Sequence, residues 1–287
     1  MSMLLFAPTA TVVASSMPQA DGLEHWAEAM GYGDLLDDET TPLAAIMRNS
    51  SGEEASGADT LPEFAGRFCY RSFKKGRPSN EYIDHILESG HGSVLEHVSV
   101  SFAITGVSRA LTHELIRHRA GTAISQESQR YVDAKSVNFV VPPLLVYELE
   151  RLKAEGNGAV AQELTDRFQA DCDAALENYL FWQKTYRAQV RDSGEEAKTL
   201  IKKRSNEAAR SLLPNATETR LVWTMNLRAA RHVVELRGHR DADLEIRRLA
   251  CMMARKMKEV TPLVFHDVEV FTDEDGLESV RAGYRKV

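Results

Sequence analysis

The chain has 287 residues, 43% of them hydrophobic, and a formal net charge of −7 at pH 7. This length and composition allow a substantial buried core, and the acidic balance argues against a general binder of nucleic acid or of anionic membranes. No stretch reaches the roughly eighteen apolar residues that a membrane-spanning helix needs. We therefore expect a cytoplasmic protein without a membrane segment.

The N-terminal part is predicted to be a small segment attached to a larger domain. Residues 3–17 are expected to include an edge strand, because Pro8 interrupts their apolar run. The Ser- and Gly-rich stretch 49–59 is expected to be a linker. We therefore expect residues 1–60 to form an N-terminal strand and linker segment packed on the core, and residues 61–287 to form the main domain.

The next elements are predicted from apolar periodicity. Helical spacing predicts a helix over 81–88, which the glycine-containing residues 89–92 end. Apolar residues at alternate positions predict a half-buried strand over 98–104, which Gly106 ends. Apolar residues four apart then predict a helix from about residue 107 to 118.

The second half is predicted to be mostly helical. We expect a strand over 137–141 and helices over 144–213. A last long helical section is expected after Pro214, and it carries Asn226, Arg228, His232 and Arg237. A closing strand is expected over 264–271, followed by a solvated acidic tail that begins at Asp273. This irregular alternation of strands and helices predicts the α+β class.

The segment from Arg117 to Tyr131 is the most informative part of the chain. It begins with Arg117-His118-Arg119, continues with small and polar residues, and ends in Ser128-Gln129-Arg130-Tyr131. Hydroxyl, amide and guanidinium groups within three residues suit a phosphate monoester. If the helix continues, Arg117 and Arg119 lie about 200° apart around it and can face different ligands. The alternative for such a cluster is a solvated, salt-bridged helix end.

Two other site types are tested by spacing. His113-Glu114 begins like the zinc-protease pattern, but the position one turn after His113 is Arg117, a cation, so no metal site is predicted. The Gly-x-Gly sequences lack the third glycine of a dinucleotide-binding fingerprint, and no phosphate-binding lysine loop of the Walker type is present. The three cysteines, Cys69, Cys172 and Cys251, are widely spaced and expected to be buried free thiols in a reducing compartment.

The cationic segment resembles the signature of the flavin-dependent thymidylate synthases, in which Arg-His-Arg is followed by seven residues and a serine. Similar segments extend the resemblance over most of residues 62 to 270; these are 63–67, 90–97, 108–117, 213–220 and 245–248. The resemblance implies the fold of that family, a mixed sheet with long helices, and a homotetramer whose active sites are built from several subunits.

The resemblance also implies residue roles. The expected FAD contacts are Ser93, Arg117, His118, Arg119, Gln126, Asn226, Leu227, Arg228 and His232. The expected contacts to a uridine nucleotide are Glu114, Arg117, Gln126, Ser128, Gln129, Arg130, Arg210 and Arg237. Arg237 is the expected catalytic residue, because its guanidinium stabilises negative charge on the pyrimidine and so makes C5 nucleophilic.

By the same resemblance, the reaction takes its carbon from 5,10-methylenetetrahydrofolate and its hydride from FAD reduced by NADPH. No cysteine of the enzyme attacks the nucleotide, which agrees with three cysteines that lie outside every matching motif. One position departs from the family: Asp241 stands where a histidine is common.

A second departure concerns substrate choice. Eight residues, 120–127, separate Arg119 from Ser128, and we expect this longer, glycine-containing loop to be more mobile. In this longer loop the chain resembles one branch of the family, the nucleotide C5-methylases of polyoxin-type antibiotic pathways, which accept UMP. We therefore expect methylation at C5 of UMP, dUMP or both. The alternatives are an ordinary dUMP-specific thymidylate synthase, a C5 hydroxymethyltransferase and a nucleotide-binding homologue without turnover.

Overall fold

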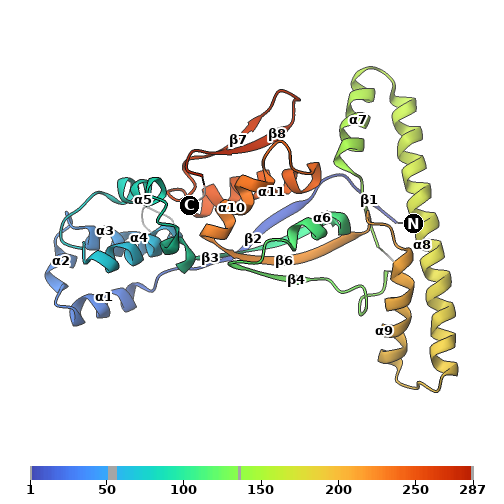
Figure 1. Cartoon of the computed structure of the whole chain (residues 1–287), viewed down its shortest axis with the longest axis horizontal. Helices are drawn as coiled ribbons and strands as arrows, with labels where there is room; N and C mark the ends of the chain where they lie inside the picture. Colours follow the sequence, from blue (N-terminus) through green and yellow to red (C-terminus); the bar gives the residue numbers. More distant parts are fainter. Residues whose placement is uncertain (1, 51–56, 135–136, 286–287) are drawn as a thin grey trace. The chain divides into compact units, whose positions relative to one another are not determined.

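The computed structural model describes residues 2–50, 57–134 and 137–285 (Figure 1). Its contacts divide the chain into two compact units, which we call unit 1 and unit 2. Unit 1 comprises Met1–Thr9, Ile104–Arg117 and Ser125–Leu221. Unit 2 comprises Ala10–Ala103, His118–Ile124 and Val222–Val287. Helices and strands alternate irregularly along the chain, which confirms the predicted α+β class.

A four-stranded sheet has the strand order β2-β3-β6-β4. Its strands are β2 (Thr9–Ser15), β3 (Ser99–Ser108), β6 (Glu218–Asn226) and β4 (Thr122–Gln126). The position of β2 confirms the edge strand predicted near the N-terminus. Just before it, β1 (Leu4–Leu5) pairs in parallel with β5 (Phe139–Val140), which is shorter than the strand predicted over 137–141.

Strand β3 continues beyond its predicted end. Gly106 lies inside the strand with φ of +69°, where an added Cβ would approach the carbonyl oxygen of Ala7 to 2.8 Å. The strand ends at Ser108, whose side chain caps helix α6 (Arg109–Leu115) by accepting a hydrogen bond from Leu111 N at 3.2 Å. Because α6 ends at Leu115, residues 117–119 are not helical. The prediction that Arg117 and Arg119 face different directions around a helix was therefore wrong.

Strand β6 lies where a helical section was predicted. Side chains at alternate positions, Leu221, Trp223 and Met225, are almost fully buried, whereas those between them are more exposed. A period of two with an aromatic side chain favours a strand with one buried face. The helical prediction holds only from α10 (Leu227–Arg237), which the Asn226 side chain caps by accepting a hydrogen bond from Ala229 N at 2.8 Å.

The helices of unit 1 confirm the helical character predicted for 144–213. They are α7 (Pro143–Ala154), α8 (Gly158–Asp192), α9 (Lys198–Ala209) and the short 3₁₀ helix Arg210–Leu212. Figure 1 shows α7 and α9 packed along different halves of α8. The core beside α8 includes Tyr179, Cys172 and Phe139.

Unit 2 has several helices before β3, and an aromatic cluster lies among the first four of them. The helices are α1 (Ala20–Ala29), α2 (Gly33–Asp37), α3 (Pro42–Ser50), α4 (Gly57–Tyr70), α5 (Ser79–Glu88) and the 3₁₀ helix Gly92–His97. Trp26 packs against Phe64 and Phe73 with ring centroids 4.9 and 5.1 Å apart. Residues 51–56 of the predicted linker lie outside the described residues, and its two ends belong to α3 and α4 instead. Helix α5 confirms the helix predicted over 81–88.

The C-terminal part of unit 2 consists of α11 (Leu244–Val260) and an antiparallel hairpin of β7 (Val268–Thr272) and β8 (Glu278–Ala282). The closing strand thus begins later than predicted, and β8 was not predicted. The prediction of a solvated tail was wrong at Asp273, whose side chain is buried in an ion pair with Arg247. Among the described residues, no helix combines the length and apolar composition needed to cross a membrane.

Candidate functional site

In unit 2, His118 and Arg237 form a direct hydrogen bond. Arg237 Nε donates to His118 Nε2 at 2.8 Å. His118 lies just after α6 and Arg237 ends α10, so the bond joins residues 119 positions apart in the chain. Because an arginine N–H is always a donor, His118 Nε2 must be unprotonated, and the proton of the neutral ring lies on Nδ1.

The surroundings of His118 keep its ring neutral. The residue is only 8% exposed, and its ring centroid lies 6.1 Å from that of Trp223 and 5.7 Å from that of His232. Burial, with further contributions from Arg237 and His232, lowers the pKa of His118 to about 4. At neutral pH the imidazole therefore acts as a fixed acceptor that orients the Arg237 guanidinium.

Close packing fixes the turn that follows His118. Gly121 has φ of +66°, and an added Cβ would lie 2.6 Å from Asn226 Nδ2. Asn226 N also donates to the Gly121 carbonyl at 2.9 Å. The Arg-His-Arg segment is thus attached to the start of α10 at a point where only glycine fits.

The other predicted flavin contacts of unit 2 are mostly polar and exposed. Ser93, Arg119, Arg228 and His232 are exposed, whereas Leu227 is fully buried at the start of α10. Arg228 forms an exposed ion pair with Glu96 at 2.7 Å. This set combines guanidinium, imidazole and hydroxyl donors, which suit the phosphates and polar edges of a dinucleotide.

In unit 1, Gln126 lies near two arginines, Arg109 and Arg210. Its side-chain amide donates to Thr219 Oγ1 at 3.0 Å, and the Arg109 guanidinium lies 3.5 Å from the same oxygen. Burial and the neighbouring Arg210 lower the pKa of Arg109. The predicted residues Gln126 and Arg210 therefore share a neighbourhood with Arg109 and Thr219, to which no role was assigned from the sequence.

The segment from Ser128 to Val132 is a turn attached to helix α9. Ser128 Oγ accepts a hydrogen bond from Arg130 N at 3.3 Å, and the Ser128 carbonyl accepts from Val132 N at 2.9 Å. Arg130 Nε donates to Glu207 Oε2 at 2.8 Å, and its carbonyl accepts from the buried Asn206 amide at 3.2 Å. Helix α9 therefore sets the conformation of the predicted phosphate-binding turn.

Three further predicted nucleotide contacts also belong to unit 1. Glu114 is half-buried in α6, Arg117 is exposed just beyond that helix, and Gln129 lies in the turn before Arg130. Their position in unit 1 separates the predicted contacts into two groups. The group in unit 2 holds Arg237 and all predicted flavin contacts except Arg117 and Gln126.

The longer stretch between Arg119 and Ser128 is a strand rather than a loop. Residues Thr122–Gln126 form β4, the edge strand next to β6. The prediction of a loop was therefore wrong; Gly121 makes the turn, and the following residues alternate between half-buried and exposed as in a sheet edge.

The cysteines agree only in part with their prediction. Cys172 and Cys251 are buried, and burial raises the pKa of each thiol to about 11, so neither is a thiolate at neutral pH. Cys69 is exposed near the end of α4, which contradicts the prediction that all three are buried.

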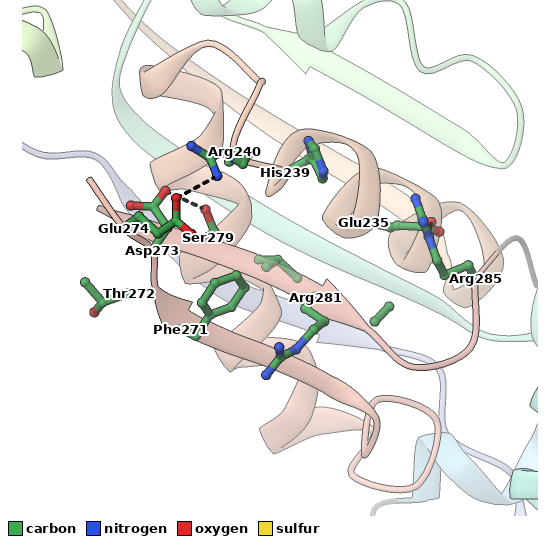
Figure 2. Close-up of a pocket in the computed structure, with 12 residues that line it drawn as sticks. Glu235, His239, Arg240, Phe271, Thr272, Asp273, Glu274, Ser279, Arg281 and Arg285 are labelled. Carbon is green, nitrogen blue, oxygen red and sulfur yellow. Dashed lines mark hydrogen bonds and ion pairs between the residues drawn. The ribbon is translucent and has the colours of Figure 1, made fainter. Parts of the chain in front are cut away.

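A cavity of about 500 Å³, which we call the hairpin pocket, lies between the end of α10 and the β7–β8 hairpin (Figure 2). Its lining includes three arginines, and each has a carboxylate partner: Arg240 with Asp275, Arg281 with Glu269 and Arg285 with Glu235. None of the residues predicted to bind flavin or nucleotide lines this pocket.

Comparisons with known proteins match both the sequence and the fold. The family model described as Thymidylate synthase complementing protein (Thy1) matches residues 53–263. The flavin-dependent thymidylate synthase of Mycobacterium sp. (strain JLS) is 45% identical over 233 residues, which cover 78% of this chain and 85% of that protein. The protein of the same name from Mycobacterium tuberculosis (strain ATCC 25177 / H37Ra) is 44% identical over 229 residues, with the same coverage.

One solved structure is similar over nearly the whole chain. It is the crystal structure of a UMP/dUMP methylase, PolB from Streptomyces cacaoi, bound with 5-Br UMP. The TM-score is 0.59 at 21% sequence identity, and the match covers 93% of this chain and 96% of the other. At this identity the similarity shows a shared fold.

Proposed function

Because the chain belongs to the Thy1 family of flavin-dependent thymidylate synthases, we propose that it methylates C5 of a uridine 5′-monophosphate, UMP or dUMP. The observation that carries this proposal is the hydrogen bond between neutral His118 and Arg237, which presents a permanent positive charge in a fixed direction. A fixed cation is what the reaction requires beside a pyrimidine that becomes negatively charged.

In this proposal, FAD binds to the exposed donors of unit 2. Arg119, Arg228 and His232 offer charged or polar groups to its diphosphate, and Ser93 offers a hydroxyl. The ion pair of Arg228 with Glu96 is exposed on both sides, so a phosphate can replace the carboxylate at little cost. FAD supplies the hydride equivalent for the methyl group, with NADPH as its reductant and 5,10-methylenetetrahydrofolate as the carbon donor.

Arg237 has the catalytic role in the proposed mechanism. Its guanidinium lies against the pyrimidine and stabilises the negative charge that develops when N3 loses its proton, which increases electron density at C5. His118 holds the Arg237 Nε, so the remaining N–H groups of the guanidinium point in a constant direction. No thiolate is needed, in agreement with the raised pKa of the two buried cysteines.

The groups of unit 1 bind the nucleotide in this proposal. Ser128 and Arg130 take the 5′-phosphate at the turn held by α9, with Gln129 beside them, and Arg210 adds a second guanidinium. Glu114, Arg117 and Gln126 complete the nucleotide contacts. We further propose that the active sites form in a homotetramer, and that residues 61–287 are the functional domain, because they include every residue assigned to the site.

The proposed substrate class includes both UMP and dUMP. The expected mobile loop is an ordered edge strand, so loop mobility no longer supports acceptance of ribose. Support comes instead from the fold shared with a UMP/dUMP methylase. An ordinary dUMP-specific synthase is the second candidate, favoured by the identity to the mycobacterial relatives.

The proposal is tested by incubating the purified chain with FAD, NADPH, methylenetetrahydrofolate and either nucleotide, followed by mass spectrometry. We expect a C5-methylated nucleotide that forms only when FAD and NADPH are both present. A hydroxymethylated product would indicate hydroxymethyl transfer, and nucleotide binding without any product would indicate a homologue that has lost turnover. Either result would overturn the proposal.

A further inference from the structure

Besides the hairpin pocket of unit 2, a pocket in unit 1 is lined mainly by positively charged side chains. This pocket, which we call the lysine pocket, has a volume of about 300 Å³. It is lined by Arg130, Tyr131, Lys198, Thr199, Lys202 and Lys203. We propose that the lysine pocket binds the anionic end of a co-substrate through phosphate or carboxylate oxygens. The identity of the co-substrates rests on the proposed function.

The lysines of this pocket are placed where positive charge is unfavourable. Lys198 is the first residue of α9, at the end of the helix where unpaired backbone N–H groups already carry partial positive charge. Lys198 and Lys202 are four residues apart in the same helix, so their like charges lie on one face. Lys203 adds a third charge directly after Lys202. Without an anion, this arrangement costs stability.

The lining of the lysine pocket provides no carboxylate for these charges. In the described ranges, none of the three lysines forms an ion pair with a carboxylate, and no carboxylate lines the pocket. The Lys203 ammonium lies 5.6 Å from the ring centroid of Tyr131, whose side chain is 53% exposed. Arg130 is the fourth cation of the lining, and it forms an exposed ion pair with Glu207 at 2.8 Å.

The hairpin pocket shows that arginines in a cavity do not by themselves indicate an anion site. That cavity is larger, yet each of its three arginines has a carboxylate partner, as described above. The lysine pocket differs because its three lysines have no carboxylate partner among the described residues, in a chain whose formal net charge is −7. Local uncompensated charge against an acidic background points to a negatively charged ligand.

Two co-substrates of the proposed reaction carry suitable anions. Methylenetetrahydrofolate ends in glutamate carboxylates, and a chain of several glutamates would bring one carboxylate to each lysine. NADPH has a 2′-phosphate that could accept hydrogen bonds from two lysines at once. Both are anionic oxygen ligands, and the exposed Tyr131 ring can pack against the less polar part of either.

The test measures binding without turnover, so it does not depend on methylase activity. Isothermal titration calorimetry at low ionic strength is used with tri-γ-glutamate as one probe and adenosine 2′,5′-bisphosphate as the other. The Lys198→Ala/Lys202→Ala double variant is compared with wild type and with Lys184→Ala, an exposed lysine on α8. We expect at least one probe to bind, with about 20-fold weaker binding in the double variant and less than about 2-fold change in Lys184→Ala.

The two probes identify the source of the anion. Loss of tri-γ-glutamate binding in the double variant assigns the pocket to the folate tail, and loss of bisphosphate binding assigns it to the reductant. The inference is overturned if neither probe binds, or if the double variant binds both probes as wild type does. It is also overturned if the double variant has a lower Tm than wild type without any anion, because removal of repelling charges should leave Tm unchanged or raise it.

Discussion

The two groups of proposed site residues are held in different ways. In unit 2, a buried imidazole, 8% exposed, holds Arg237, and a glycine with no room for a side chain joins the Arg-His-Arg segment to α10. In unit 1, Arg130 is 38% exposed and lies on a turn that an ion pair with Glu207 attaches to α9. The first arrangement is formed by packing, and the second by polar contacts that water or a ligand can replace.

This difference suggests a division of labour. A buried, neutral hydrogen-bond acceptor keeps a charge in place throughout the reaction, as stabilisation of a developing anion requires. An exposed ion pair contributes about 0–1 kcal/mol to stability, so a substrate phosphate can displace it and later leave. We therefore expect substitutions in unit 2 to have larger effects than equivalent substitutions in unit 1.

The largest effect is expected from Arg237→Ala. Loss of the charge beside the pyrimidine should lower kcat by about 10³-fold, a typical cost of removing one group that stabilises a developing anion. Steady-state kinetics should be measured together with the dissociation constant of dUMP, and Arg237→Lys serves as the control that keeps the charge. An unchanged kcat with weaker nucleotide binding would show that Arg237 only binds substrate.

The packing at Gly121 is tested by Gly121→Ala. The positive φ and the 2.6 Å approach to Asn226 should together lower the free energy of unfolding by about 2–4 kcal/mol and weaken FAD retention. Gly156→Ala is the matched control, because Gly156 also has a positive φ of +82° but no atom within 4 Å of an added Cβ. Equal destabilisation of the two variants in urea would show that the close approach to Asn226 is unimportant.

The buried imidazole predicts a pH dependence of stability. His118 has a pKa of about 4 when folded and an ordinary value near 6.5 when unfolded, so between these values only the unfolded chain binds the proton. Stability is thus unaffected above about pH 6.5 and decreases as the pH falls toward 4. Between pH 7.5 and 5, wild type should lose about 2 kcal/mol more than His118→Gln. Parallel curves for the two proteins would contradict a buried neutral histidine.

The smallest effect is expected from Glu207→Gln in unit 1. Loss of its exposed ion pair with Arg130 should change the free energy of unfolding by less than about 1 kcal/mol. Glu63→Gln provides the contrast in unit 2, because Glu63 and Arg67 are both 1% exposed and breaking such a buried pair costs about 3–5 kcal/mol. Similar losses for the two variants in denaturant titrations would remove the distinction between exposed and buried pairs.

The sequence predicted the fold class and the segments that supply the site, but not their geometry. Period-two burial was recognised in β3 and missed in β6, because the polar residues that follow β6 fit the helical pattern of α10. The end of α6 at Leu115 could not be read from periodicity, and this error placed Arg117 and Arg119 on a helix that does not exist there.

The contacts between distant residues could not be predicted from local patterns. The hydrogen bond between His118 and Arg237 depends on the position of β4 beside β6, the strand that leads into α10. The two residues are 119 positions apart in the sequence, and this spacing does not predict their contact. From the sequence, Gly121 was expected to make the loop mobile. In the structure it packs closely against Asn226, whose Nδ2 would lie 2.6 Å from an added Cβ. The residue types therefore indicated the chemistry of the site, but the tertiary contacts that constrain these residues could not be predicted from the sequence.

The most direct test of the proposed function follows the carbon atom. UMP and dUMP are supplied together with methylenetetrahydrofolate labelled at its methylene carbon, with FAD and NADPH, and the nucleotides are analysed by mass spectrometry and NMR. We predict that the label appears in a methyl group on C5 of one or both nucleotides. Absence of the label from both nucleotides, with FAD bound and reduced, would contradict the proposed methylation of a uridine monophosphate.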